Sequence, residues 1–179
     1  SIHAVLGENG SGKSTLVKLL SGIVAPTRGT IRIDGTPIGS SGPPEVQALG
    51  LPTVFQEVLI APDRSVADNI LLGTGTMFAR RAPRAARRQL VADVLARITR
   101  TPNDLDAPAG SFSLATGQLI LLARGLVRDP RILILDEVTA ALDHPDREGV
   151  FQMMEGHAGP RRLILFISHR IDEVLRLAD

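Results

Sequence analysis

The stretch from residue 7 to residue 15 carries the clearest chemical pattern in the sequence. It matches G-x-x-x-x-G-K-[ST], the loop that wraps the phosphates of a nucleotide. Its glycines let the backbone turn tightly and bring N–H groups close to an anion. The predicted binding residues for a nucleoside triphosphate are Gly7, Glu8, Asn9, Gly10, Ser11, Gly12, Lys13, Ser14 and Thr15.

A short apolar run and an amphipathic helix flank this loop, which is the context that the motif needs. Residues 2–6 have the composition of a buried strand, and residues 14–20 indicate a helix that ends before Gly22. The start of a helix offers unpaired amides and the positive end of its dipole to an anion. We expect Lys13 to reach the outer phosphates and the Ser14 hydroxyl to bind Mg²⁺. A glycine turn before an ordinary helix is the plainer alternative, and the flanks disfavour it.

Polar side chains follow three further apolar runs that we predict as strands. The strands are residues 53–55, 132–135 and 163–167, and the side chains at their ends are Gln56, Asp136 with Glu137, and His169. In open α/β sheets, ligands bind at the carboxyl ends of the strands. We therefore expect these side chains to meet the phosphate loop at one edge of the sheet. Taken singly, each would be explained as an ordinary solvated or hydrogen-bonded polar group.

These side chains suit the hydrolysis of a phosphoanhydride. A carboxylate at the end of an apolar strand, here Asp136, holds Mg²⁺ together with the phosphate-loop Ser14. Glu137 is placed to accept a proton from attacking water. Gln56 either orients that water or contacts the metal, and His169 holds the γ-phosphate and the base in place. The predicted catalytic residues are Lys13, Gln56, Glu137 and His169, and the predicted metal ligands are Ser14, Gln56 and Asp136.

Length and composition favour one packed domain without disulfides. The chain has 179 residues, 44% of them apolar, a net charge of +1 and no cysteine. The near-neutral balance argues against bulk attraction to nucleic acid or acidic lipid. No stretch approaches the roughly 20 apolar residues that span a bilayer. The sequence opens directly on the strand before the phosphate loop and has no tail, so we expect it to be truncated at both ends.

The order of the predicted elements indicates an α/β fold. Strands alternate with helices around one helical interruption, which favours a P-loop NTPase with a mainly parallel sheet flanked by helices. We expect residues 1–56 and 129–179 to form the nucleotide-binding α/β core and residues 57–128 to form an inserted helical subdomain, all within one domain. Further expected elements are a strand at 30–33, a loop at 35–50 with a short helix at 45–49, and helices at 65–72, 83–98, 118–127, 145–154 and 171–177.

A run of arginines precedes and lines one side of the predicted helix at 83–98. Its members are Arg80, Arg81, Arg84, Arg87 and Arg88. Such a run is typical either of a nucleic-acid contact surface or of a solvated helix face. The near-neutral charge and the absence of Tyr and Trp for base stacking favour the solvated face.

Taken in order along the chain, these motifs resemble those of the ATP-binding cassette (ABC) ATPases. Six motifs occur in the order found in that family. They are the phosphate loop, Gln56, the segment Leu114, Ala115, Thr116, Gly117 and Gln118, the pair Asp136-Glu137, the segment Ala141, Leu142 and Asp143, and His169. Within that family the chain is most similar to the first cassette of bacterial monosaccharide importers.

The resemblance implies a mechanism that rests on pairs of cassettes. Two cassettes would clamp two ATP molecules, each site joining one phosphate loop to the partner's signature segment, here residues 114–118. Residues 141–143 correspond to the family's D-loop. ATP and Mg²⁺ are the implied cofactors. The implied partners are a second cassette in tandem or as a dimer, transmembrane permease subunits and a solute-binding protein, with no nucleic acid. The implied location is the cytoplasmic side of the membrane, as a peripheral subunit.

The signature departs from the family pattern Leu-Ser-Gly-Gly-Gln. Ala115 lacks the hydroxyl that would bond the partner's γ-phosphate, which we expect to weaken closure by about 1.5–3 kcal/mol. Val138 stands where the family often has Pro. The leading hypothesis is an ATP-hydrolysing subunit that powers the import of a solute, a sugar by resemblance. The alternatives are a nucleotide-gated clamp that hydrolyses weakly, and a soluble ABC protein acting on nucleic acid or the ribosome.

Overall fold

The computed structural model describes residues 1–8, 10–38, 42–73, 82–99 and 104–178. The chain divides into two compact units. The first, here the α/β unit, comprises Ser1–Phe55, Pro130–Glu137 and Ala158–Asp179. The second, here the helical unit, comprises Gln56–Asp129 and Val138–His157. Each unit is described by itself below.

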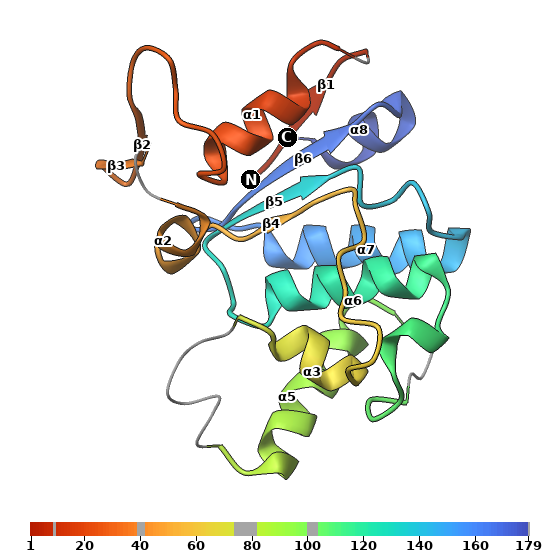
Figure 1. Cartoon of the computed structure of the whole chain (residues 1–179). Helices are drawn as coiled ribbons and strands as arrows, with labels where there is room; N and C mark the ends of the chain where they lie inside the picture. The colour runs from red at the N-terminus through yellow and green to blue at the C-terminus, as the bar shows by residue number, and fades with distance from the viewer. Residues whose placement is uncertain (9, 39–41, 74–81, 100–103, 179) are drawn as a thin grey trace. The chain divides into compact units, whose positions relative to one another are not determined.

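A parallel sheet forms the centre of the α/β unit (Figure 1). Within the described residues its strand order is β1 (Ile2–Leu6), β6 (Leu163–Ser168), β5 (Ile132–Asp136) and β4 (Thr53–Val54). Side chains of the two central strands are buried on both faces, as continuous apolar runs in parallel sheets require. The strands predicted at residues 2–6, 53–55, 132–135 and 163–167 are thus all present.

The register of this sheet sets the position of the polar residues. Leu6 lies opposite Ser168, and Asp136 lies opposite Ile167. Since all four strands run the same way, the residues after Leu6, Asp136 and Ser168 emerge at one edge. That edge is where the phosphate loop begins.

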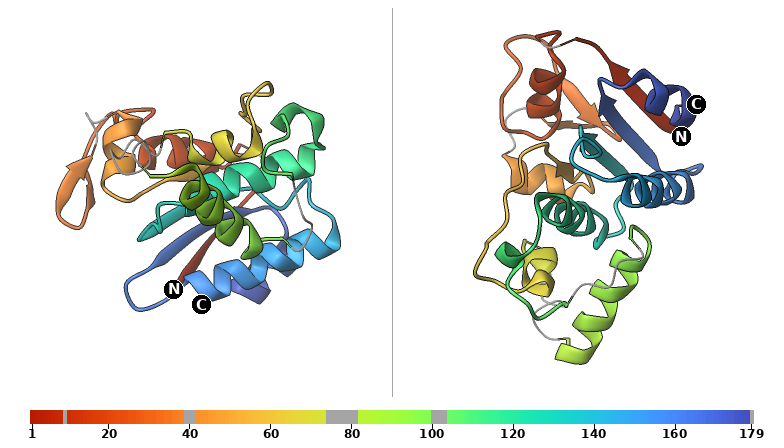
Figure 2. Two further views of the ribbon diagram at one scale, coloured as in Figure 1. Left: turned by 90° about the horizontal axis from the view of Figure 1, so that it is seen from below. Right: turned by 90° about the vertical axis from the view of Figure 1, so that its right-hand side faces the viewer.

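Two helices and a hairpin complete the α/β unit. Helix α1 (Lys13–Leu20) contacts β5, and α8 (Ile171–Leu177) lies beside β1 and β6, as the right view in Figure 2 shows. Strands β2 (Ile31–Ile33) and β3 (Thr36–Ile38) pair antiparallel, and α2 (Pro43–Ala48) follows. Residues 36–38 were expected as loop, and this expectation is wrong. Ile38 is buried in the same apolar cluster as Ile33, so the second arm of the hairpin has a core to pack against.

The helical unit is built around α6 (Leu114–Leu126), which packs against α3 (Val66–Leu71) and α5 (Arg84–Ala96). A short 3₁₀ turn, η1 (Ala109–Ser111), precedes α6, and α7 (His144–His157) also belongs to this unit. Nine residues of α6 are buried, so the helix needs apolar neighbours on most sides. Among the described residues, the helices are too short or too polar for any of them to cross a lipid bilayer.

Helix α6 begins earlier than the predicted range of 118–127. Its first residue is Leu114, and Ser113 caps it by accepting a hydrogen bond from the Thr116 N–H at 3.2 Å. Gly117 has a low helix propensity, and for this reason the helix was predicted to begin only after it. The prediction that the helix begins at Gln118 is therefore wrong, because the whole segment 114–118 lies in its first two turns.

Candidate functional site: a phosphate loop and the strand ends beside it

The phosphate loop has the backbone conformation of an anion cradle. Gly10 and Gly12 have φ angles of 84° and 93°, which residues with a Cβ rarely adopt. The Ser11 N–H donates to the Glu8 carbonyl at 3.2 Å and closes the turn. Gly12 occupies the N-cap position of α1 without a side chain that could cap it, so the first-turn amides stay available for a ligand. Asn9 lies outside the described residues.

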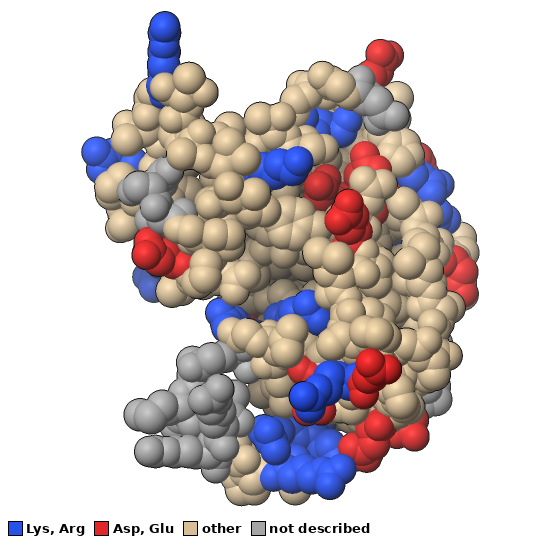
Figure 3. All heavy atoms as spheres, in the orientation of Figure 1, with Lys and Arg blue, Asp and Glu red and all other residues tan. Residues whose placement is uncertain are grey.

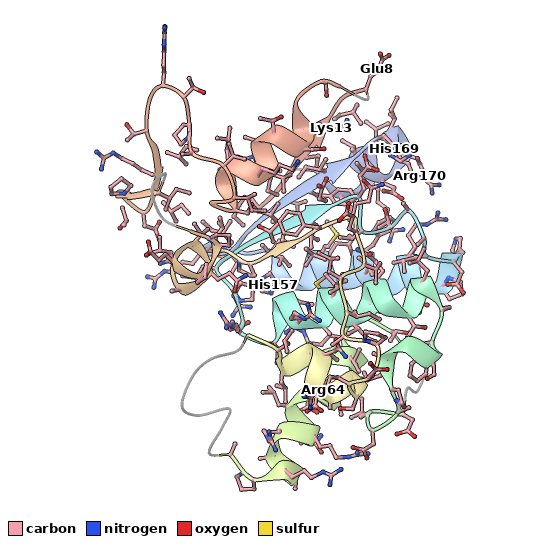
Figure 4. The ribbon with its side chains drawn as sticks, viewed as in Figure 1. Glu8, Lys13, Arg64, His157, His169 and Arg170 are labelled. Carbon is pink, nitrogen blue, oxygen red and sulfur yellow. The ribbon has the colours of Figure 1, made fainter. Side chains whose placement is uncertain are left out.

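Lys13 lies inside this loop. Its side chain is buried, with 8% of the residue exposed, and its Nζ donates to the Gly7 carbonyl at 2.5 Å and the Glu8 carbonyl at 2.9 Å. Two carbonyl oxygens of the loop thus hold the end of this side chain in place. Figure 4 shows Lys13 and His169 at the same end of the α/β unit, where β1 and β6 terminate.

Glu137 and His169 meet at the strand ends. His169 Nδ1 lies 3.3 Å from Glu137 Oε2, and the Glu137 side chain is only 14% exposed while that of His169 is 53% exposed. The Glu137 N–H donates to the Ile167 carbonyl at 3.0 Å, one residue beyond the last paired residue of β5. Glu137 also has a φ of 50°, a left-handed conformation that costs about 1–2 kcal/mol for a residue with a side chain. Strained backbone of this kind clusters at functional sites.

The charges of Glu137 and Lys13 both act on the carboxyl of Asp136. Burial raises the pKa of the Asp136 carboxyl above its ordinary value, the charge of Glu137 raises it further, and the charge of Lys13 opposes both. The site thus gathers two carboxylates and one ammonium group within interacting distance. Such a cluster favours the binding of a cation that would satisfy the second carboxylate.

The segment 114–118 forms the start of α6 in the helical unit. Leu114 is 66% exposed, whereas Gln118 is 3% exposed. A Cβ added at Gly117 would lie 2.7 Å from Val58 Cγ1, so this position admits little more than a hydrogen atom. The signature glycine therefore serves close packing of α6 against the loop that follows Gln56.

Gln56 and the segment 141–143 also belong to the helical unit. Gln56 is its first residue and is exposed. Ala141 and Leu142 precede Asp143, whose Oδ1 accepts from the Asp146 N–H at 3.0 Å. Asp143 thus caps α7. The α/β unit holds Lys13, Asp136, Glu137 and His169 with the other described residues of the phosphate loop, whereas Gln56 and the segments 114–118 and 141–143 lie in the helical unit.

The sequence profile of the ABC transporter family matches residues 1–140 of this chain. This range contains the phosphate loop, the signature segment and both strand-end acids. The chain belongs to the ABC transporter family.

Named relatives narrow the comparison within the ABC family. Ribose import ATP-binding protein RbsA 1 of Rhizobium johnstonii is 40% identical over 179 residues, covering 100% of this chain and 35% of that protein. Arabinose import ATP-binding protein AraG 1 of Burkholderia ambifaria is 36% identical over 184 residues, covering 99% of this chain and 35% of that protein. The chain thus spans about a third of the length of these relatives.

Solved ABC structures share the fold. The ATP-binding cassette MJ0796, in a dimeric post-hydrolysis state bound to ADP and Pi, matches with a TM-score of 0.83 at 22% identity. The match covers 96% of this chain and 75% of that one. A second dimeric structure of MJ0796 gives a TM-score of 0.84 at 23% identity, covering 99% and 77%. The predicted P-loop NTPase fold is confirmed.

Two residues hold helix α6 in place, and neither of them was predicted to have this role. Arg124 of α6 donates from Nε to the Asn69 carbonyl at 2.7 Å and from Nη1 to the Leu59 carbonyl at 3.2 Å. Ser113 is the N-cap described above. A serine three residues before Thr116 at the start of an apolar run was a visible capping signal. The pairing of Arg124 with carbonyls 55 and 65 residues away had no local signal.

The arginine run is partly engaged in ion pairs on the surface. Lys and Arg side chains gather over α5 in Figure 3, and Arg84 and Arg88 both pair with Asp106. The hydrogen bond from Arg88 and, to a smaller extent, that from Arg84 lower the pKa of the Asp106 carboxyl. Paired arginines fit the solvated-face interpretation better than a nucleic-acid surface. Arg80 and Arg81 lie outside the described residues.

Proposed function

We propose that this chain is the ATP-binding and ATP-hydrolysing part of an ABC importer for a sugar. The observation that carries the proposal is the contact of Glu137 with His169 at the sheet edge where the phosphate loop begins. A phosphate cradle alone binds nucleotide, whereas a shielded carboxylate beside it supplies a base for attacking water.

Each residue of the α/β unit has a part in this scheme. The amides at the start of α1 and the Lys13 ammonium group bind the phosphates and offset their growing charge. Glu137 accepts the proton of the attacking water. His169 Nδ1, when it carries a proton, donates to Glu137 Oε2 and keeps that carboxylate oriented. Gln56, at the start of the helical unit, orients the water or contacts the metal.

The acids of the site suit Mg²⁺. Asp136 is half-buried beside Glu137, and burial and the charge of Glu137 raise the pKa of its carboxyl, which supports a cation as its partner. Asp136, the Ser14 hydroxyl and Gln56 are the oxygen donors that would hold the ion, as hard cations prefer. When bound, the ion would neutralise charge on the β- and γ-phosphates.

The partners follow from the family and the relatives. The names of the relatives specify ribose and arabinose import, and they favour import over a weakly hydrolysing clamp or a role on nucleic acid. We propose a second cassette, permease subunits and a solute-binding protein as partners. The chain would act at the cytoplasmic side of the membrane as a peripheral subunit. ATP would join the phosphate loop of one cassette to the signature segment 114–118 of the other.

Uptake by the assembled transporter tests this proposal. The full-length protein and its permease would be placed in vesicles with ATP and Mg²⁺, and entry of labelled ribose, arabinose and xylose would be measured. The proposal predicts ATP-dependent uptake of one of these sugars and none with Lys13→Ala, because the phosphates lose their counter-charge. Uptake unaffected by Lys13→Ala would contradict it.

A further inference from the structure

A buried carboxylate holds the turn between β6 and α8. Glu173 lies in the first turn of α8, and its side chain is 1% exposed. One oxygen, Oε2, accepts a hydrogen bond from Ser168 Oγ at 2.9 Å. The other, Oε1, lies 3.4 Å from Arg170 Nε. A buried carboxylate is stable only when such partners compensate its lost hydration.

These partners are the two sequence neighbours of His169. The Arg170 N–H donates to Ser168 Oγ at 3.1 Å, so a small closed network surrounds the histidine backbone on both sides. Figure 4 shows His169 and Arg170 together at this turn. Ser168 is itself anchored in the sheet opposite Leu6, the residue before the phosphate loop.

The histidine side chain itself is half-exposed. It is 53% exposed, and its Nδ1 approaches Glu137 Oε2 at 3.3 Å. A half-exposed ring keeps such a contact only while its backbone is held in place. The backbone at residue 169 is held by the network that Glu173 completes.

We propose that Glu173 is a positioning residue for ATP hydrolysis, acting through His169 on Glu137. This role rests on the proposed function. Glu173 fixes the turn at both sides of His169. The fixed turn keeps the imidazole within reach of Glu137, the proposed base. A displacement of about 1 Å at a reacting group can cost a hundredfold in rate.

Turnover of the full-length protein with its permease is the first test. Glu173→Ala should lower kcat by about ten- to a hundredfold and leave the KM for ATP within about twofold, since the phosphate cradle is untouched. Glu173→Gln keeps an oxygen that can accept from Ser168 Oγ, so it should lose less. Asp172→Ala is the matched control, because Asp172 is an exposed acid in the same turn that also faces Arg170, at 3.7 Å. It should retain wild-type kcat.

The ring signals of His169 separate positioning from simple stabilisation. With ¹⁵N-labelled histidine in the full-length chain, Glu173→Ala should move the His169 ring nitrogens toward the shifts of a solvent-exposed imidazole, while Asp172→Ala leaves them unchanged. The His169→Ala spectrum assigns the signals. Unchanged His169 signals in Glu173→Ala, or an equal loss of kcat in both variants, would overturn the role. If the wild-type protein showed no turnover while Glu173→Ala still moved the His169 signals, the proposed function would be refuted. The positioning of His169 by Glu173 would then still hold.

Discussion

Replacing Asn69 should destabilise the helical unit. Asn69 is fully buried, and its amide bonds to the loop after Gln56: Oδ1 accepts from the Ala61 N–H at 2.8 Å, and Nδ2 donates to the Ala61 carbonyl at 2.9 Å. Nδ2 also reaches the carbonyls of Arg64 and Ser65 at 3.3 and 3.1 Å. Arg124 Nη2 lies 3.3 Å from Oδ1, and burial lowers the pKa of this guanidinium group.

The size of the effect follows from the group left without a partner. Asn69→Ala strips the partly buried Ala61 N–H of its side-chain partner, whereas the Ala61 carbonyl keeps the Arg64 N–H at 3.1 Å. One such unpaired group costs about 1–3 kcal/mol. We therefore expect a loss of about 1–3 kcal/mol in unfolding free energy, a substantial part of the 5–15 kcal/mol that stabilises a typical domain. Urea unfolding of the full-length chain, followed by circular dichroism, measures it.

Two further variants identify the cause. Asn69→Leu fills a similar volume without hydrogen bonds and should destabilise as much as Asn69→Ala. Asp68→Ala, at an exposed position in the same helix, should cost less than about 1 kcal/mol. If Asn69→Leu unfolded at the wild-type urea concentration, buried volume and not hydrogen bonding would explain the site, and this reasoning would be refuted.

Two smaller perturbations test the strand-end acids and the signature helix. The pKa of the Asp136 carboxyl is higher in the folded state than in the unfolded state. Between the ordinary and the raised pKa the folded state therefore binds more protons, so the free energy of unfolding falls as pH rises through that window. Asp136→Asn should remove this fall and make the nucleotide-free chain more stable than wild type at neutral pH in urea titrations; an unchanged pH slope would argue against it. Ser113→Ala removes the cap of α6 and should cost about 1 kcal/mol in the same assay, with Ser113→Asp restoring most of it. A Ser113→Asp variant as unstable as Ser113→Ala would show that the cap contributes little.

Much of the α/β unit could be predicted because its signals are local. An apolar run followed by G-x-x-x-x-G-K-S defines a strand, a loop and a helix without reference to the rest of the chain. Helix α8 was placed at its observed residues, and α3 to within a residue at each end, because Ser65 supplies a visible cap.

Features that depend on distant partners could not be predicted. The second arm of the hairpin, Thr36–Ile38, is a strand because Ile38 reaches the buried cluster around Val17, which the turn-rich sequence does not reveal. The left-handed backbone of Glu137 depends on strand register and not on spacing, although Glu137 and His169 were expected to meet at one edge of the sheet. The tight approach of Gly117 to Val58 likewise arises only when the loop after Gln56 folds onto α6. The catalytic roles themselves stay predictions.

Phosphate release by the full-length protein with its permease, wild type beside Glu137→Gln, tests the central claim most directly. The amide keeps the shape of the side chain but cannot accept a proton, so kcat should fall by about 10²–10⁴-fold. Binding of a fluorescent ATP analogue should be retained, because the cradle and Lys13 are unchanged. Wild-type turnover with an ATP-loaded, inactive variant would support Glu137 as the base. Equal turnover in both proteins would contradict the account.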